Sequence, residues 1–378
     1  MSAPIRIVIA AGGTAGHVVP ALAVADALRA DGASVVFVGG ERAEKELVPA
    51  AGYELRTLSV EGISRTNPLK AARAVAKAGA GVVLARSLLG SLRPDAVMGG
   101  GGYVAGTVGA AAASRRLPLV LTEADSHLGI SNRMLARFAT RVCLAFPLDG
   151  RDGDRYLVTG RPVPPPATDR AAARARFGLA DGDVVVLVFG GSLGARSING
   201  AALEAFADAA TVDGWVAPAS GSASTRGAAP ASGSARRVRI LHAAGARDFA
   251  TLGSPGPHYD LREYIDGFGE ALLASDLVVA RSGGSIFEVA AHGRAAILIP
   301  YPHAAADHQS ANARWMEKAG AAIVVPDAEL TAQRLADEVA ALLRDRDRLA
   351  AMSAASAALA RPDAAQAIAN ELLAAAAR

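Results

Sequence analysis

Residues 5–17 read IRIVIAAGGTAGH, an apolar strand-like run that ends in two glycines and a small-residue turn before a helical pattern begins. The same arrangement returns at residues 184–195, where VVVLVF is followed by GGSLGA. Such a junction brings backbone N–H groups and a helix N-terminus together where a phosphate can bind. Two such junctions about 180 residues apart predict two α/β domains that face a cleft.

Strand-like and helical runs alternate on both sides of a proline-rich break at residues 160–166, GRPVPPP. The alternation predicts a doubly wound parallel sheet in each half. Strands are expected at 5–10, 34–38, 96–98, 119–122, 142–145, 184–189, 240–244, 277–280, 296–299 and 322–325. We expect one domain over 1–160, a hinge over 161–166, a second domain over 167–345, and a helical segment over 346–378 that packs back on the first domain.

The composition excludes several classes of protein. The 378 residues carry a formal net charge of +3, and Lys and Arg are spread along the chain, which argues against a nucleic-acid binder. The single cysteine, Cys143, lies in an apolar run, so we expect it to pack in a core of a cytosolic chain. No leader precedes the first strand, no stretch is apolar enough to span a membrane, and 217–234 is expected to be a surface insertion.

The first glycine turn comes close to a dinucleotide fingerprint. Gly13 and Gly16 match the last two glycines of G-x-G-x-x-G, but Ala11 replaces the first, and Glu41 stands where a ribose-binding acid would be. Glycines that serve close packing alone are the alternative. His17 at the helix start favours chemistry, because a helix N-terminus lowers the pKa of an imidazole and leaves a neutral ring able to accept a proton.

Two further stretches in the first half follow strands. Four glycines at 99–102 precede Tyr103, and we expect them where a ligand or another backbone approaches closely, unless they form a plain flexible loop. Residues 122–127, TEADSH, close another strand and would place Glu123 and Asp125 in the binding crevice. A capping role is as plausible for either carboxylate as a catalytic one.

The second half offers two comparable stretches. In 281–288, RSGGSIFE, small residues at a helix start suit a phosphate, and Glu288 can accept hydrogen bonds from two ribose hydroxyls. In 300–312, His303 and His308 are five residues apart and lack a cysteine partner, which fits metal ligation poorly. Hydrogen bonding of sugar hydroxyls by Asp307, His308 and Gln309 fits better.

Together these stretches resemble the MurG family, the UDP-N-acetylglucosamine–N-acetylmuramyl-(pentapeptide) pyrophosphoryl-undecaprenol N-acetylglucosamine transferases. The matching stretches are GGTAGHVVPALAVADAL at 12–28, GGYVAGTVG at 101–109, NRMLARFATRVCLAFP at 132–147, FGGSLGARSIN at 189–199, REYIDGFGEALLASDLVVARSGGSIFEVAAHG at 262–293 and PYPHAAADHQSANAR at 300–314. The resemblance implies a GT-B architecture, in which two Rossmann-like domains face a central cleft, and it implies no cofactor and no catalytic metal.

The resemblance also implies roles for individual residues. His17 is the first candidate for the catalytic base and Glu123 the second. The residue patterns and the resemblance together give the donor contacts as Thr14, Ala15, Gly16, Asp125, Arg161, Ser192, Ile265, Arg281, Gly284, Ser285, Ile286, Glu288, His308 and Gln309. They give the acceptor contacts as Gly13, Gly101, Gly102 and Tyr103. Ser192 and 284–286 would contact the donor diphosphate, Ile265 the uracil and Glu288 the ribose.

The chain departs from the family pattern at two donor contacts. Residues 122–125 read TEAD where the family has His-Glu-Gln-Asn, so Asp125 replaces an amide. Residues 161–164 read RPVP where the family has Asn-Pro-Val-Arg, and Arg161 could reach the space of the missing arginine.

The activity implied is inverting transfer of N-acetylglucosamine (GlcNAc) from UDP-GlcNAc to the muramyl 4-hydroxyl of undecaprenyl-pyrophosphoryl-MurNAc-pentapeptide. This step converts lipid I to lipid II in peptidoglycan synthesis. Main-chain dipoles would stabilise the leaving diphosphate. The acceptor implies peripheral binding at the cytoplasmic face of the bacterial membrane, and Lys70, Arg73 and Lys77 within an apolar helix suit anionic lipid, although an ordinary surface helix fits as well.

Three other functions remain open from the sequence. A glycosyltransferase of similar build could act on another acceptor, such as a specialised metabolite. A nucleotide-dependent oxidoreductase would need the first glycine that Ala11 replaces. A sensor of nucleotide sugars without catalysis would not need His17 or Glu123.

Overall fold

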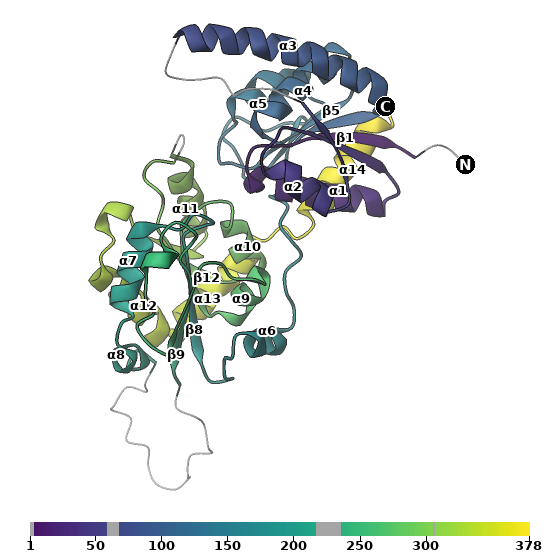
Figure 1. Cartoon of the computed structure of the whole chain (residues 1–378). Helices are drawn as coiled ribbons and strands as arrows, with labels where there is room; N and C mark the ends of the chain where they lie inside the picture. Colours follow the sequence, from purple (N-terminus) through teal and green to yellow (C-terminus); the bar gives the residue numbers. More distant parts are fainter. Residues whose placement is uncertain (1–3, 59–67, 217–235, 305–306) are drawn as a thin grey trace, which may run out of the picture. The chain divides into compact units, whose positions relative to one another are not determined.

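The computed structural model describes residues 4–58, 68–216, 236–304 and 307–378, except for the side chains of residues 68–78. The chain divides into two compact units, one formed by Met1–Pro164 with Arg361–Arg378 and the other by Pro165–Ala360. Each unit is a parallel sheet with helices on both faces (Figure 1). The doubly wound α/β fold predicted from the alternation is confirmed. No helix in the described part of the chain is both long and apolar enough to cross a bilayer.

Unit 1 contains a seven-stranded sheet with the order β3-β2-β1-β4-β5-β6-β7. Its strands are β1 (Arg6–Ala10), β2 (Ser34–Gly39), β3 (Glu54–Thr57), β4 (Ala96–Gly99), β5 (Leu119–Glu123), β6 (Arg141–Leu144) and β7 (Tyr156–Val158). Its helices are α1 (Ala15–Ala30), α2 (Ala43–Ala50), α3 (Pro68–Leu92), α4 (Gly102–Ser114), α5 (Ile130–Leu135), η1 (Ala136–Phe138) and α14 (Ala364–Ala376).

The central strand of unit 1 separates two cores. Ile7 and Ile9 of β1 pack on the face covered by α1 and α14, whereas Val8 and Ala10 pack on the face covered by α3 and α4. This alternation is the period of two that an extended chain imposes on its side chains. Cys143 is buried in the first of these cores, as predicted, and burial raises the pKa of its thiol to about 12.

Unit 2 contains a six-stranded sheet with the order β10-β9-β8-β11-β12-β13. Its strands are β8 (Val184–Phe189), β9 (Val238–Ala243), β10 (Tyr259–Arg262), β11 (Leu277–Ala280), β12 (Ala295–Leu298) and β13 (Ala322–Val324). Its helices are α6 (Arg170–Arg176), α7 (Arg196–Ala205), α8 (Ala209–Asp213), η2 (Phe249–Thr251), α9 (Phe268–Ala274), α10 (Ile286–Ala291), α11 (His308–Lys318), η4 (Asp327–Glu329), α12 (Ala332–Arg344) and α13 (Arg346–Ala358).

The strand register places the glycine-rich turns at a switch point in each sheet. In unit 1, Ala10 at the end of β1 pairs with Gly99 at the end of β4. In unit 2, Phe189 at the end of β8 pairs with Ala280 at the end of β11. In both sheets these neighbours are where the strand order reverses, which is where ligands bind in open α/β sheets.

Three strands, β3, β7 and β10, were not predicted. Each lies at the edge of its sheet; β3 and β10 contain charged residues and β7 has only three residues, so none of them has the long apolar run that marks the central strands. The C-terminal tail after α12 forms two helices, of which α13 belongs to unit 2 and α14 to unit 1. The expected insertion at 217–234 lies outside the described residues.

The last part of the tail, Arg361–Arg378, belongs to unit 1. Helix α14, yellow in Figure 1, packs against α1 and β4, and its Ile368 and Leu372 are fully buried there. Arg141 on β6 also forms an ion pair with Glu371 of this helix at 2.8 Å.

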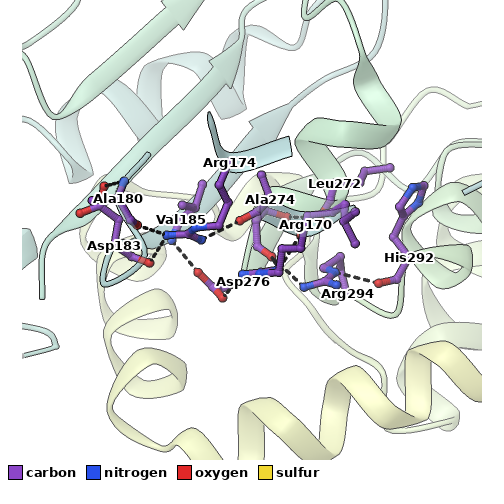
Figure 2. Close-up of polar contacts among 12 residues, drawn as sticks. Arg170, Arg174, Ala180, Asp183, Val185, Leu272, Ala274, Asp276, His292 and Arg294 are labelled. Atoms are coloured by element: carbon purple, nitrogen blue, oxygen red, sulfur yellow. Dashed lines mark hydrogen bonds and ion pairs between the residues drawn. The ribbon is translucent and has the colours of Figure 1, made fainter. Parts of the chain in front are cut away.

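Three arginines anchor the C-terminal end of α9, the helix that leads into β11 (Figure 2). Arg170, Arg174 and Arg294 each donate to carbonyl oxygens within residues 273–275. Arg170 also pairs with Asp276 at 2.8 Å. Cations satisfy the free carbonyls at a helix end and offset the negative end of its dipole. These contacts hold the connection between α9 and the start of β11.

Candidate active site

His17 lies on the first turn of α1, directly after the glycine turn of β1. Its Nδ1 is 3.3 Å from the hydroxyl of Thr14, the residue that precedes the helix. Burial lowers the pKa of His17, Asp125 raises it, and Arg161 lowers it, with a net pKa below the ordinary value. The ring is therefore neutral near pH 7 and can accept a proton.

The glycines after β4 allow close packing against His17. A Cβ on Gly101 would lie 2.5 Å from the ring of His17, and one on Gly102 would lie 2.4 Å from the carbonyl oxygen of Gly12. Both glycines have a positive φ, a backbone conformation that residues with a Cβ rarely adopt. Another backbone thus approaches this loop closely, as predicted for four consecutive glycines.

A cavity of about 380 Å³ in unit 1 is lined by most of the residues predicted to contact the acceptor and by both candidate bases. Its lining includes His17, Gly101, Gly102, Tyr103, Glu123 and Asp125. Thr14 and Ala15 are exposed beside it and do not line it. Arg161 hydrogen-bonds the carbonyl oxygen of Gly16 at 2.7 Å, so it reaches the start of α1 from the chain segment after β7.

Glu123 is buried at the end of β5 and holds the loop that follows it. One carboxylate oxygen accepts the backbone N–H of Gly129 at 2.8 Å and the side-chain amide of Asn132 at 2.9 Å. The other accepts the N–H of Asp125 at 3.2 Å. Burial raises the pKa of Glu123 and these three donors counteract it, with a net pKa above the ordinary value. The contacts favour a loop-organising role, and its role as a base stays a prediction.

Unit 2 places its glycine turn against the loop that follows β9. A Cβ on Gly194 would lie 1.9 Å from the carbonyl oxygen of Ala244, and one on Gly245 would lie 2.1 Å from the nitrogen of Gly194. The two backbones therefore touch, and Ser192 at the tip of the turn is exposed. The predicted diphosphate contact is accessible to a ligand.

Arg281 ties together three segments around this turn. It donates to Asp327 at 2.5 Å, to the hydroxyl of Ser197 on α7 at 2.9 Å, and to the carbonyl oxygens of Ile299 and Pro300. Ser197 also donates to Asp327. Arg281 is only 8% exposed, so most of its guanidinium is engaged inside the protein.

Gln309, at the second position of α11, links two further loops. Its side-chain oxygen accepts the N–H of Tyr301 at 3.0 Å, and its backbone carbonyl accepts the hydroxyl of Ser282. Asn312, one turn later, donates to the carbonyl oxygen of Ser282. Among the described residues no hydrogen bond involves the side-chain amide nitrogen of Gln309, and its contact with a sugar hydroxyl stays a prediction.

A cavity of about 620 Å³ lies at this end of the unit 2 sheet. It is lined by three arginines, Arg196, Arg247 and Arg281, together with Asp327 and Gln309. Sequence reasoning missed Arg196 and Arg247, although both directly follow small-residue turns. The cavity carries an excess of positive charge, which suits a diphosphate.

Other predicted donor residues lie near this region but do not line that cavity. Ile265 is buried after β10, and Ile286 is fully buried at the start of α10, where its backbone N–H donates to the carbonyl oxygen of Gly283 at 3.3 Å. Gly284, Ser285, Glu288 and His308 are half-buried. These roles stay predictions.

Two further hypotheses from the sequence concern a metal site and a membrane-binding surface. Within the residues that the structure describes, no group of three or more His, Cys, Asp or Glu side chains could hold a metal ion. Lys70, Arg73 and Lys77 lie on α3, but their side chains are outside the described part. Glu41, the alternative ribose acid, is exposed.

Two parallel α/β units, each with a cavity at the carboxyl end of its sheet, are typical of the GT-B fold of glycosyltransferases. Residues 7–144 match the glycosyltransferase family 28 N-terminal domain and residues 185–368 match the glycosyltransferase family 28 C-terminal domain.

Full-length relatives narrow the assignment. A UDP-N-acetylglucosamine--N-acetylmuramyl-(pentapeptide) pyrophosphoryl-undecaprenol N-acetylglucosamine transferase of Moorella thermoacetica is 38% identical and aligns over 97% of this chain and 98% of its own length. A relative of the same name from Rubrobacter xylanophilus is 39% identical, with 93% and 98% covered. The crystal structure of Acinetobacter baumannii MurG superposes with a TM-score of 0.74 at 26% identity, over 98% of this chain and all of that one. CalG4, the calicheamicin glycosyltransferase, shares the fold with a TM-score of 0.68 at 17% identity, over 99% of both chains.

The chain belongs to the MurG family, within glycosyltransferase family 28. It is therefore a hexosyltransferase of the GlcNAc-transferring kind.

Proposed function

We propose that this chain transfers GlcNAc from UDP-GlcNAc to the 4-hydroxyl of the muramyl group of undecaprenyl-pyrophosphoryl-MurNAc-pentapeptide, with inversion at the anomeric carbon. The observation that carries the proposal is the end-to-end similarity to relatives named for this transfer, at 38% identity over 97% of the chain. The cavities of the two units supply the chemistry that the reaction needs.

The cavity of unit 2 fits the donor. As the bond between the anomeric carbon and the diphosphate oxygen breaks, negative charge develops on UDP, and fixed positive groups lower the energy of that state most. Arg196, Arg247 and Arg281 line the cavity, and the exposed Ser192 lies in the same turn as the lining residues Gly190 and Leu193. Gln309 presents its amide to the sugar hydroxyls.

The cavity of unit 1 fits the acceptor and the base. The attacking hydroxyl must lose its proton, and His17 is the neutral group at that cavity with a lowered pKa. The proton passes to the imidazole while the hydroxyl oxygen bonds to the anomeric carbon, and UDP leaves with the electron pair of the broken bond. Both oxygens of Glu123 are occupied by donors, which makes His17 the stronger candidate.

The test is GlcNAc transfer by the purified chain to a lipid-linked muramyl-pentapeptide acceptor, followed by product mass. His17→Ala should lower kcat by roughly 10²–10⁴-fold, the usual contribution of a general base. The Kd for UDP should not change, because UDP binds unit 2 in this proposal. Near wild-type turnover in His17→Ala would reject the base, and transfer to other acceptors alone would reject the substrate.

We further propose that the chain binds the cytoplasmic face of the bacterial membrane peripherally through unit 1. Ile130, Met134 and Phe138 are four residues apart on α5 and η1, and each is more than half exposed, at 54–66%. The exposed Arg133 and Arg137 lie between them. An apolar row flanked by cations suits shallow insertion into anionic lipid.

Sedimentation with anionic vesicles tests this surface. Replacing Ile130, Met134 and Phe138 by Ser should reduce binding, and salt should weaken the binding that remains. The matched control replaces Leu157 and Val158 by Ser. These two residues are also apolar and exposed, but they lie on the edge strand β7, so their replacement should leave binding unchanged. Equal losses in the two variants would contradict an insertion site on α5.

A further inference from the structure

A carboxylate is fully buried beneath the catalytic loop of unit 1, where no sequence pattern indicated one. Glu44, the second residue of α2, has no exposed surface. One carboxylate oxygen accepts the backbone N–H of Gly13 at 2.9 Å and the other accepts the N–H of Gly40 at 2.8 Å. The side chain therefore bridges the turns that follow β1 and β2.

Glu44 is held by backbone dipoles and not by a cation. Within the described residues no Lys, Arg or His forms an ion pair with it. Burial alone would raise the pKa of Glu44, but the N–H groups of Gly13, Glu44 itself, Gly40 and Arg42 outweigh it, and the pKa lies below the ordinary value. The carboxylate is thus ionised at neutral pH and accepts strong hydrogen bonds.

Glycines make the space for this carboxylate. A Cβ on Gly12 would lie 2.8 Å from a Glu44 oxygen, one on Gly40 would lie 2.9 Å from the same oxygen, and one on Gly39 would lie 2.7 Å from its Cγ. Side chains at these three positions would displace Glu44. The glycines in both turns are therefore explained by the carboxylate that they enclose.

The hydrogen bond to Gly13 fixes a peptide that the rest of the site uses. The N–H of Gly13 and the carbonyl of Gly12 belong to one peptide plane. Glu44 holds the N–H, and the loop after β4 packs on the carbonyl, 2.4 Å from where a Cβ on Gly102 would be. The same loop packs on the ring of His17. A rotation of this peptide would move both walls of the acceptor cavity.

We propose that Glu44 is a positioning residue for the transfer reaction: it orients the Gly12–Gly13 peptide and thereby sets His17 and the loop at 101–103 in their reactive geometry. Glu44 does not line the cavity that His17 and this loop form, so it acts through them. It also takes the N–H of Gly13, which a dinucleotide-binding turn would direct to a phosphate, and this disfavours the oxidoreductase alternative. The inference rests on the proposed function only for its kinetic test.

The first experiment compares Glu44→Gln with Glu46→Gln. Glu46 lies in the same first turn of α2 but is exposed, so its substitution removes the same charge without touching the loop. In Glu44→Gln, the side-chain NH₂ group would face the backbone N–H of either Gly13 or Gly40, and that hydrogen bond would be lost because both groups are donors. We expect kcat for GlcNAc transfer to fall roughly 10²-fold, as for a misplaced catalytic group, with an unchanged Kd for UDP. Unchanged kcat in Glu44→Gln overturns the proposal.

A double-mutant cycle separates positioning from general destabilisation. If Glu44 acts through His17, then Glu44→Gln should cost less than about 3-fold in a His17→Ala background, because the group that it positions is gone. A full 10²-fold loss in both backgrounds overturns the proposal. Glu44→Asp, which keeps the charge and should fold if the glutamine variant does not, should give an intermediate loss of kcat that also disappears in the His17→Ala background.

Amide hydrogen exchange tests the same idea without any activity. In Glu44→Gln, exchange should accelerate in peptides covering 11–17 and 99–103 and stay unchanged in unit 2. Unchanged exchange in both peptides overturns the positioning role. A wild-type chain that transfers no GlcNAc would reject the proposed function, while this measurement would still decide on Glu44.

Discussion

Replacing Arg281 by methionine should destabilise unit 2 far more than replacing another arginine of the same cavity. Arg281 is 8% exposed and its guanidinium makes four hydrogen bonds, to Asp327, Ser197 and two backbone carbonyls. Methionine keeps the length of the apolar stem and removes all four bonds. Asp327 would then remain mostly buried with only the hydroxyl of Ser197 as a donor among these contacts.

The expected loss of stability depends on the charge of Asp327, which the substitution leaves without its cation. Removing one partner of a buried ion pair costs about 3–5 kcal/mol because the other charge stays buried. The Asp327 side chain is 22% exposed and keeps the hydrogen bond of Ser197, so the lower end, about 3 kcal/mol, applies. For a unit of this size each kcal/mol moves Tm by roughly 2–4 °C, so the transition of unit 2 should fall by roughly 6–12 °C.

The assay is calorimetry of the whole chain with and without UDP, which identifies the transition of the unit that binds the nucleotide. Arg196→Met is the matched control, since the Arg196 side chain lines the same cavity, is 77% exposed and shares Asp248 with Arg247. Asp248 is buried, but it keeps its ion pair with Arg247 when Arg196 is replaced, so the loss should be about 1 kcal/mol and Tm should fall by no more than a few degrees. Equal losses of Tm in the two variants would refute the argument from burial.

Two other predictions concern unit 1. Activity is lost as His17 becomes protonated, so the acid limb of the kcat/KM profile should lie below the ordinary histidine range. Asp125→Asn should move this limb to lower pH, because Asp125 raises the pKa of His17, and Arg161→Gln should move it to higher pH, because Arg161 lowers that pKa. Shifts in the same direction would contradict His17 as the base. Asn132→Ala should destabilise unit 1 by about 1.5–3 kcal/mol in a denaturant titration, because buried Glu123 loses a charge-assisted hydrogen bond, and an unchanged midpoint would contradict that role.

The central part of the fold could be predicted because its signal is local. β1 and β8 are runs of β-branched and other apolar residues that end at paired glycines, and each begins a βα junction. β3, β7 and β10 could not be found in the same way, since an edge strand exposes part of its surface and needs no apolar run. Edge position alone does not hide a strand, because β13 also lies at an edge and its apolar run at 322–324 was predicted.

The residues of the candidate site also differ in whether the local sequence could reveal them. His17 and Ser192 follow directly from the strand–turn–helix pattern that carries them. Glu44 could not be predicted, because its two partners lie in turns after different strands and only the register of β1 and β2 brings these turns together. Its neighbours Glu41 and Glu46 are exposed, and nothing in the local sequence separates the buried acid from them.

The two units use similar junctions for opposite electrostatic purposes. In unit 1 the turn after β1 is held by an anion, Glu44, and the cavity beside it contains Glu123 and Asp125. In unit 2 the turn after β8 is held by backbone contact and by a cation, since Arg247 donates to the carbonyl oxygen of Gly194 at 3.2 Å, and the cavity beside it is lined by three arginines against one aspartate. The first arrangement suits a base that must accept a proton, because nearby carboxylates stabilise the imidazolium that forms. The second suits a leaving group that gains negative charge. The charge of each cavity therefore gives a physical reason, independent of the similarity to known transferases, for assigning the nucleotide to unit 2 and the attacking hydroxyl to unit 1.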